Sequence, residues 1–369
     1  MKPLRYLFIA MICLMLGCER NVIDKLGMLD AIGYDLSEDQ ELPLMVTANY
    51  PNVTKQGVYQ NKILTVNAKS SKDSRIRLNH RSNLKLVSGQ ITVALFGSEL
   101  AKVGVQDIID TYMRDPSLGP RVYFAVTEGP AKEILDFKPI EGTNSSLYLR
   151  TFIEKLDDEN ERINYNTYQF IRDYYDDGID PIMPYYKLRS DNISLDGYAL
   201  FKDDRFVHHL SPTLSGILFT LRKNTPRGTF SFEIAPPDDT HVFSNQLMFD
   251  YVKKDWDIDI AFNNHIPKTV KISIELNGSM LEYTNDELTD SKKTQMKLEK
   301  KINAYMEKKS EEFLELTQQL KVDPVGIGGY VRNKLSYEDW NHLNWEEVYP
   351  EIDFDVTIQM KFVNTGQTK

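Results

Sequence analysis

The most regular hydrophobic pattern lies in the last third of the chain, where apolar and polar residues alternate. Apolar residues occupy every even position from 352 to 362, and polar or charged residues occupy every odd position from 351 to 361. Residues 256–262 and 270–276 show the same period of two. This period places alternate side chains on opposite faces of a strand, so these segments predict half-buried antiparallel strands.

One long helix is predicted between these strands, over residues 291–320. Its apolar residues recur at spacings of three and four along one stripe: Leu298, Ile302, Tyr305, Phe313, Leu316 and Leu320. Asp323-Pro324 follows and ends the helical pattern. The last strand would expose six apolar side chains on one side, so we expect the helix to cover that side in an α+β domain.

Strand and helix patterns alternate in the first half of the chain. Short strands are predicted over residues 29–35, 44–50, 63–68, 90–96 and 121–126, and helices over residues 72–83 and 105–113. This alternation predicts a mixed α/β domain with a mixed sheet.

The length of 369 residues predicts more than one domain. Turn signals between residues 176 and 181 precede a boundary that we place near residues 189–194. The predicted division is a leader over residues 1–17, an N-terminal mixed α/β domain over residues 18–190, and a C-terminal α+β domain over residues 195–365. The last of these is long enough for two subdomains.

The leader has the pattern of a bacterial lipoprotein signal. Lys2 and Arg5 precede an apolar run of 11 residues, 6–16, which fits a signal-peptide core of ~7–15 residues and is too short to span a bilayer. Gly17 then precedes Cys18. The pattern predicts lipidation of Cys18 after cleavage, with several acyl chains giving firm membrane attachment. The alternatives are a plain signal peptide and a buried first helix with an incidental cysteine.

Charge and cysteine content narrow the class of protein. The net charge is −10, and loss of Lys2 and Arg5 with the leader makes it −12. An acidic chain argues against nucleic-acid binding and against electrostatic attachment to anionic lipid. The two cysteines are Cys13 and Cys18. Cys13 leaves with the leader, so no disulfide is expected in the mature chain.

No catalytic or metal-binding set is visible in the sequence. The six histidines show no zinc-ligand spacing: His80, His208, His209, His241, His265 and His342. The chain also lacks a Gly-x-Ser-x-Gly elbow. We therefore predict a protein that is not an enzyme and that needs no metal or cofactor. His208-His209 is interpreted as an exposed pair in a turn.

Two groups of carboxylates are candidates for a cation site. Asp35-x-Ser37-x-Asp39 resembles the start of a calcium loop, but the glycine and the later bidentate glutamate of such loops are missing. The favoured interpretation is a polar hairpin turn. The aspartates between residues 173 and 180 could gather a cation, although a solvated turn fits better.

Glycines and tyrosines supply two further candidates. Residues 326–329 could suggest a phosphate loop, but they follow a helix and lack the Lys-Ser/Thr of such loops, so a glycine turn is favoured. Six tyrosines could form a partner or ligand surface, or equally the edge of an aromatic core: Tyr165, Tyr168, Tyr174, Tyr175, Tyr185 and Tyr186.

Several segments, taken in order, resemble the C-subunit lipoproteins of bacterial spore-germination receptors, the Ger(x)C family. The resemblance covers nearly the whole chain and rests on Cys18 and on residues 29–35 (LDAIGYD), 97–104 (GSELAKVG), 196–202 (DGYALFK) and 323–328 (DPVGIG), with Arg332, Trp340 and Trp345. It implies a multidomain mixed α/β fold.

The resemblance also implies a non-enzymatic role. Members are lipid-anchored at the outer face of the spore inner membrane and assemble with two integral-membrane subunits into a receptor that senses nutrient germinants. Only the lipidation role, at Cys18, carries over to a residue. The alternative function is that of a free-standing solute-binding lipoprotein that feeds a transporter, and a lipid-anchored hydrolase ranks lowest.

Overall fold

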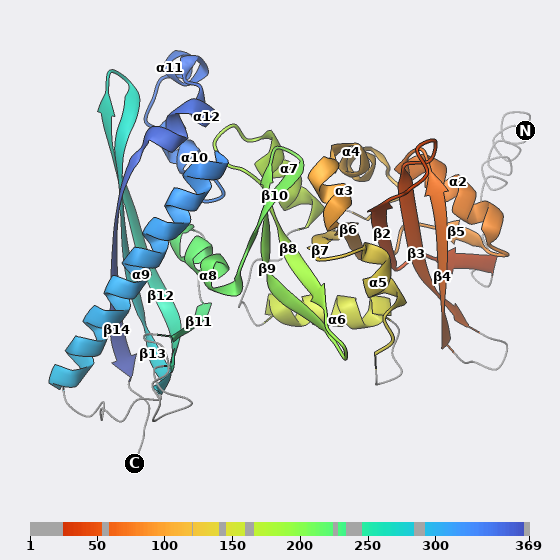
Figure 1. Ribbon diagram of the computed structural model, residues 1–369, viewed down its shortest axis with the longest axis horizontal. Coiled ribbons are helices and arrows are strands. Elements are labelled where there is room, and N and C mark those ends of the chain that lie inside the picture. Colours follow the sequence, from red (N-terminus) through yellow and green to blue (C-terminus); the bar gives the residue numbers. More distant parts are fainter. Residues whose placement is uncertain are drawn as a thin grey trace, which may run out of the picture.

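The computed structural model describes eight stretches of the chain. They are residues 25–53, 59–119, 121–139, 145–158, 166–223, 228–233, 246–283 and 292–364. The molecule is elongated, with an eight-stranded sheet toward one end and a four-stranded sheet at the other (Figure 1).

The eight-stranded sheet is mixed. Its strands, in spatial order, are β10 (Arg205–Leu210), β9 (Ile193–Lys202), β8 (Ile182–Leu188), β7 (Tyr123–Thr127), β6 (Val93–Gly97), β2 (Ala31–Leu36), β3 (Leu44–Val53) and β4 (Tyr59–Ala68). The four central strands β8, β7, β6 and β2 run parallel, and antiparallel strands flank them on both sides. The central strands are apolar on both faces, as expected for strands covered from both sides.

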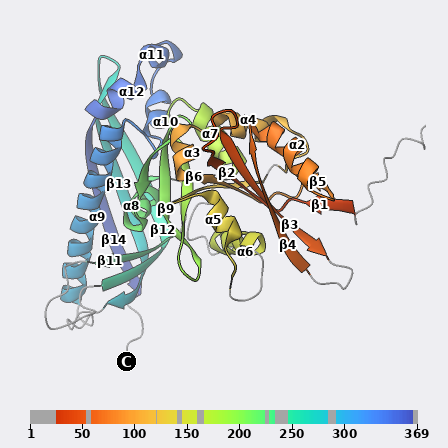
Figure 2. The same ribbon diagram turned by 45° about the vertical axis from the view of Figure 1, so that its right-hand side comes forward.

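Helices cover both faces of this sheet. One face packs against α2 (Ser71–Arg81), α3 (Ser98–Val103), α4 (Gln106–Arg114) and α7 (Thr167–Tyr175). The other face packs against α5 (Ala131–Asp136) and α6 (Ser145–Asp158). Figure 2 shows α5 and α6 on the opposite side of the strands from α2, α4 and α7. A small parallel sheet of β1 (Leu26–Met28) and β5 (Lys85–Val87) lies beside α2.

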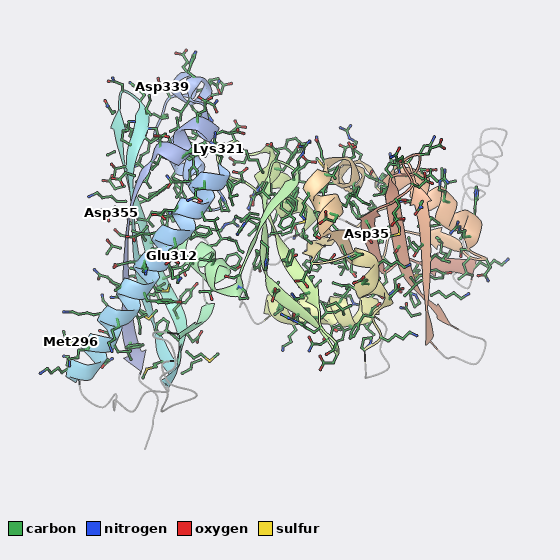
Figure 3. The ribbon with its side chains drawn as sticks, in the orientation of Figure 1. Asp35, Met296, Glu312, Lys321, Asp339 and Asp355 are labelled. Carbon is green, nitrogen blue, oxygen red and sulfur yellow. The ribbon has the colours of Figure 1, made fainter. Side chains whose placement is uncertain are left out.

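The four-stranded sheet forms the other end of the molecule. Its strands, in spatial order, are β11 (Gly228–Glu233), β12 (Gln246–Asn263), β13 (Ile266–Tyr283) and β14 (Asp353–Asn364). The long helix α9 (Lys292–Leu320) covers one face, and α8 (Pro212–Leu221) packs between α9 and the first sheet. Side chains from α9 and the sheet fill the space between them, whereas the charged residues of β14, such as Asp355, lie on the open face (Figure 3).

The four-stranded sheet and its helices form the second body, and the eight-stranded sheet and its helices form the first. The predicted helix and strands of the second body are confirmed, with one difference in strand direction. Strand β14 pairs parallel to β13, not antiparallel. The connection explains the direction, because α9 carries the chain back along the sheet before β14 begins, and such helical crossovers join parallel strands. The chain reaches β14 through α10 (Ile327–Arg332), α11 (Tyr337–His342), α12 (Trp345–Val348) and the 3₁₀ helix η2 (Tyr349–Glu351).

Helix α9 also seals the free edge of β14. The backbone N–H groups of Ile358, Met360 and Phe362 donate to side-chain oxygens of α9 at 3.0, 2.9 and 3.2 Å. The acceptors, Glu307, Asn303 and Glu299, recur every four residues along the helix, in step with every second residue of the strand. This arrangement removes the pairing capacity of an otherwise open edge.

The predicted boundary near residues 189–194 falls inside a hairpin. Leu188 of β8 pairs with Ile193 of β9 in the same sheet, and β10 adds a further strand. The change from one sheet to the other comes later, at α8. The division into two domains near residues 189–194 stays a prediction.

Candidate functional site at the junction of the two sheets

The two sheets are joined where two loops meet. One loop, residues 176–181, leads from α7 into β8, and the other, residues 321–326, leads from α9 into α10. The N–H of Asp180 donates to the carbonyl oxygen of Asp323 at 2.9 Å, and the N–H of Asp323 donates to Oδ2 of Asp180 at 2.6 Å. The two aspartates therefore clamp the start of the eight-stranded sheet's β8 to the end of the long helix.

Asp323 organises the second loop. Helix α9 ends with Lys321 in the left-handed conformation (φ +55°), after which the carboxylate of Asp323 turns inward. Its Oδ1 accepts from the N–H of Gly326 and its Oδ2 from the N–H of Gly328, both at 2.8 Å. These N–H groups lie at the start of α10, so the buried carboxylate satisfies donors that the helix itself leaves unpaired.

Glycines allow the two loops to touch. A Cβ on Gly178 would lie 2.6 Å from the carbonyl carbon of Gly328, and a Cβ on Gly328 would lie 2.7 Å from Cα of Gly178. The N–H of Gly329 donates to the carbonyl oxygen of Gly178 at 3.1 Å. Gly326 has φ +84°, which favours glycine. The expected glycine turn is limited to Gly326, because Gly328 and Gly329 already lie inside α10. Gly328 makes room for the facing loop.

Charged side chains surround this contact. Arg332 holds Asp176 through two hydrogen bonds, at 2.9 and 3.1 Å. Lys202 lies 3.0 Å from Glu346 and 3.9 Å from Asp180. Of the aspartates predicted as a solvated turn, Asp176 and Asp180 are instead partly buried and bound to Arg332 and to the N–H of Asp323, whereas Asp177 is exposed as expected.

Two mainly polar cavities, of about 360 and 470 Å³, flank the contact. The first is lined by Asp180, Lys202, Trp340 and Trp345, among others, and the second by Arg172, Arg222 and Arg332, among others. These are binding-sized spaces. The carboxylate oxygens of Asp323 accept from backbone N–H groups, so this buried acid is committed to structure rather than placed to act as a catalytic base.

A second set of bonds ties α8 to the four-stranded sheet. Lys254 Nζ donates to the carbonyl oxygens of Phe219 and Arg222, and Trp256 Nε1 donates to that of Leu221 at 2.8 Å. Arg222 Nε in turn donates to the carbonyl oxygen of Pro324 at 2.7 Å. Burial lowers the pKa of Lys254 to about 7. The C-terminal carbonyls of α8 are thus capped by side chains from the second sheet.

The junction carboxyls predict a pH-dependent stability. Burial raises the pKa of Asp323 to about 7 and that of Asp180 to about 6, above the ordinary value of 3.8. At a pH between 3.8 and these raised values, the folded chain keeps protons that the unfolded chain has lost. The stabilisation of the folded chain by this protonation is therefore fully present below about pH 4 and is lost as the pH rises through about 6 to 7.

Urea unfolding should therefore give a free energy at about pH 5 that exceeds the value at about pH 8 by on the order of 2 kcal/mol. The variant Asp323→Asn cannot titrate at this position and should show a flatter dependence. An equal slope in both proteins would contradict the assignment to Asp323.

The structure places the other sequence candidates separately. Cys18 lies outside the described residues. Asp35 is buried, and its two oxygens accept from the N–H groups of Ala131 and Lys132 at 2.7 and 3.0 Å, so it starts α5. Asp39 accepts from the N–H groups of Glu41 and Leu42, which gives the polar turn expected there.

The tyrosines divide between core and surface. Tyr185 and Tyr186 are buried in β8, whereas Tyr168 and Tyr175 on α7 are 68% and 60% exposed. Tyr174 is partly buried, and Tyr165 lies outside the described residues. The six tyrosines therefore do not form one surface.

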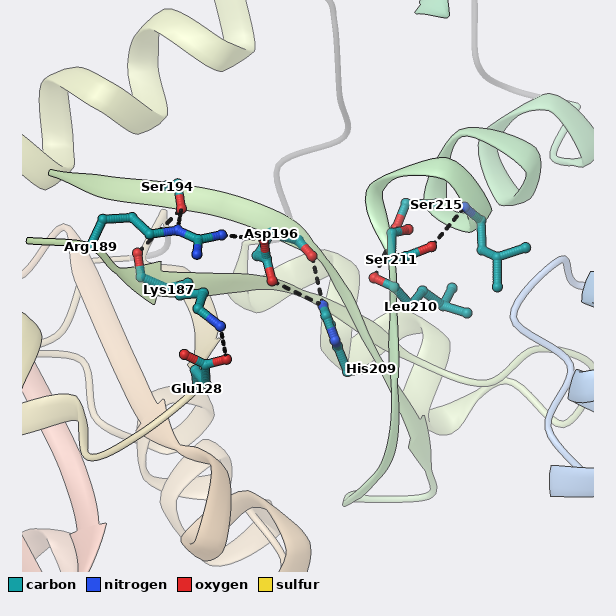
Figure 4. Close-up of polar contacts among 10 residues, drawn as sticks. Glu128, Lys187, Arg189, Ser194, Asp196, His209, Leu210, Ser211 and Ser215 are labelled. Carbon is teal, nitrogen blue, oxygen red and sulfur yellow. Dashed lines mark hydrogen bonds and ion pairs between the residues drawn. The ribbon is translucent and has the colours of Figure 1, made fainter. Parts of the chain in front are cut away.

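The interpretation of His208-His209 as a turn pair is wrong. Both residues lie in β10, where burial lowers the pKa of His208. The ring of His209 stacks on Tyr185 with centroids 4.2 Å apart, and its Nε2 donates to the carbonyl oxygen of Asp196 at 2.6 Å. Figure 4 shows His209 beside Asp196, whose carboxylate also binds Arg189. The alternating pattern of β10 is too short and too polar to have revealed this strand.

The sequence did not predict the contact that brings Gly178, Asp180 and Asp323 together. Residues 323–328 predict a helix stop and a glycine turn and contribute to the family resemblance, but nothing in their spacing points to residues 178–180. Among the described residues, no three His, Cys, Asp or Glu side chains are grouped closely enough to hold a metal ion. None of the helices in the described ranges combines the length and the apolar character that a membrane span needs.

Comparison with known proteins identifies the family. Residues 19–188 match the family described as the spore germination protein N-terminal domain, and residues 196–366 match the one described as spore germination B3/GerAC like, C-terminal. The two matched segments meet in the β8–β9 hairpin. Together they span both sheets and the junction between them.

Individual relatives extend over most of the chain. Spore germination protein GerQC of Bacillus cereus is 23% identical over 364 residues, which cover 98% of this chain and 99% of that protein. Spore germination protein B3 of Bacillus subtilis (strain 168) is 24% identical over 298 residues, which cover 76% of this chain and 74% of that protein. The crystal structure of the GerBC protein shares the fold, with a TM-score of 0.55 and 18% identity over 90% of this chain and 97% of that one. The chain therefore belongs to the Ger(x)C family, the C-subunit family of spore-germination receptors.

Proposed function

We propose that this protein is the lipid-anchored, non-catalytic subunit of a spore germinant receptor. In this role it is tethered through Cys18 to the outer face of the spore inner membrane. It assembles there with two integral-membrane subunits that respond to nutrients. The observation that carries the proposal is the match to both domains of a spore-germination family over residues 19–188 and 196–366.

The geometry of the junction supports a binding and assembly role. Its buried carboxylates are held by backbone N–H groups, its basic groups are paired with acids or carbonyls, and the contact between the loops is made by glycine backbones. Such an arrangement fixes two bodies relative to each other. An elongated body of this kind presents two sheets to separate partners at one membrane.

The test of this proposal is the variant Cys18→Ala, expressed during sporulation. Without the thiol no lipid can be attached, and the uncleaved leader is not a membrane span, so the protein should leave the membrane fraction. Nutrient-triggered germination should fall with it, while germination by agents that bypass receptors should be unchanged. Cys13→Ala is the matched control, because that residue leaves with the leader. Full membrane retention and full nutrient response of Cys18→Ala would refute the lipid-anchor role.

One observation favours the alternative of a free-standing solute-binding lipoprotein. The cavity of about 360 Å³ at the junction is lined by Trp345, whose buried Nε1 has no hydrogen-bond partner among the described residues. Saturable binding of a small molecule to the purified protein, together with no co-purifying multispan subunits, would favour this function over the receptor role.

A further inference from the structure

The charge of the chain is unevenly distributed. Residues 59–85, which form β4, α2 and the start of β5, carry seven Lys and Arg residues and a single carboxylate, Asp73. This segment therefore has a net charge of +6 in a chain whose total is −10. The net charge of the whole chain does not describe the local charge of this segment, because charges act over a Debye length of about 8 Å at physiological ionic strength.

Helix α2 presents this charge to solvent. It buries Ser71, Ser74 and Leu78 against the first body. The opposite stripe, at steps of four residues, consists of Lys72, Ile76 and His80, all exposed. Ile76 is 58% exposed, an apolar side chain one turn after Lys72 on this face.

Most cations of this segment lie at the surface. Arg75 and Arg77 form ion pairs with Asp115 and Asp73. Arg81 Nη1 donates to the carbonyl oxygen of Thr65 at 2.9 Å. Five basic residues lie in exposed or partly exposed positions: Lys62, Lys69, Lys72, Arg81 and Lys85. A cationic helix face with an exposed apolar residue is typical of surfaces that rest on the headgroup region of a bilayer.

The segment also lies where a lipid anchor would bring the bilayer. Strand β1 pairs with β5 directly beside α2, with Leu26 opposite Lys85. Six residues separate Cys18 from Lys25, so a fully extended tether reaches at most about 25 Å from the start of the folded body. Figure 1 shows α2, β4 and β5 together at one end of the molecule and the four-stranded sheet at the other.

We propose that this basic end, formed by β4, α2 and β5, docks on an anionic lipid bilayer. The proposal rests on the proposed anchoring through Cys18, which supplies the reach, and the charge and exposure of α2 supply the contact. The docked protein has two membrane signals, one lipid group and one polybasic surface. The long axis then carries the four-stranded sheet away from the bilayer.

Helix α9 provides the natural comparison. Residues 292–309 carry seven lysines, but two glutamates lie among them and bind the edge of β14. In the sequence, four carboxylates precede this helix between residues 282 and 290. The helix belongs to the opposite end of the molecule from β4, α2 and β5 (Figure 1).

The test uses the mature chain from residue 18 with Cys18→Ala, so that no lipid contributes. Sedimentation with vesicles of phosphatidylglycerol and phosphatidylcholine at low ionic strength should show binding, and vesicles of phosphatidylcholine alone should show none. The triple variant Lys69→Gln, Lys72→Gln, Arg81→Gln should bind on the order of 100-fold more weakly, about fivefold for each cation lost. Added salt should weaken the wild-type interaction.

The matched control is the triple variant Lys293→Gln, Lys301→Gln, Lys308→Gln, which removes three exposed lysines of α9 and has the same net charge. It should bind anionic vesicles like the parent chain, and thermal unfolding checks that both variants are folded. Equal losses in the two variants, an unchanged affinity of the α2 variant, or no preference of the parent chain for anionic vesicles would each overturn the docking surface. None of these outcomes bears on Cys18, whose lipidation is tested separately by membrane fractionation.

Discussion

Gly178→Ala is expected to destabilise the protein by about 2–3 kcal/mol and to loosen the attachment of one sheet to the other. The new Cβ would lie 2.6 Å from the carbonyl carbon of Gly328 and closer still to the backbone nitrogen of Gly329. Backbone atoms cannot turn aside as a flexible side chain can, so one of the two loops must move. Urea unfolding followed by circular dichroism measures the loss.

The neighbouring glycines provide a control within the same contact. Gly329 has nothing within 4 Å of its missing Cβ and lies inside α10. Gly329→Ala should therefore be neutral or stabilising by up to about 1 kcal/mol, because alanine is the better helix former. If both alanine variants lost the same stability, the close approach of the loops would not be the cause.

Asp323→Ala is expected to cost about 3 kcal/mol, the second large effect. The substitution leaves the N–H groups of Gly326 and Gly328 buried without their acceptor, each at a cost of about 1–3 kcal/mol. The gain from no longer burying a carboxylate offsets part of this loss. Thermal or urea unfolding at a pH below 6, where the carboxyl group of Asp323 is largely protonated in wild type, reports the loss of these hydrogen bonds with the least contribution from its charge.

Two comparisons isolate the hydrogen bonds. Asp323→Asn keeps one acceptor oxygen in place and should cost clearly less than the alanine variant. Asp177→Ala removes an exposed carboxylate from the facing loop and should change stability by no more than about 0.5 kcal/mol. A loss in Asp323→Ala no larger than in Asp177→Ala would mean that the carboxylate does not hold the start of α10.

The periodic parts of the fold were predictable. Apolar residues at every third or fourth position predicted α9, and strict alternation predicted β12, β13 and β14. A helix or strand that buries one face needs apolar residues at these spacings. The direction of β14 and the strand character of His208-His209 were not predictable. The first depends on how a crossover returns the chain, and the second on neighbours that are distant in sequence.

The physical role of residues in the motifs that carry the family resemblance is visible only in the tertiary structure. Asp35 and Gly97 belong to different segments, yet a Cβ on Gly97 would collide with the carboxylate of Asp35, which starts α5. Gly178 and Gly328 are likewise 150 residues apart in number and in direct contact. Spacing along a chain carries no information about such pairs, since each half looks like an ordinary loop residue.

By itself, the sequence determined the class of the elements and pointed to the family to which the chain belongs, whereas the leader with Cys18 stays a prediction. These properties are written in local patterns, either the period of a helix or strand or an ordered set of short motifs. The tertiary structure decided where the sheets meet, which buried acids hold them together, and that the cations of β4, α2 and β5 gather at one end. Those properties arise from long-range packing, which brings residues far apart in the sequence into one buried contact or onto one exposed face. The net charge of the chain and the period of a single segment do not show such groupings.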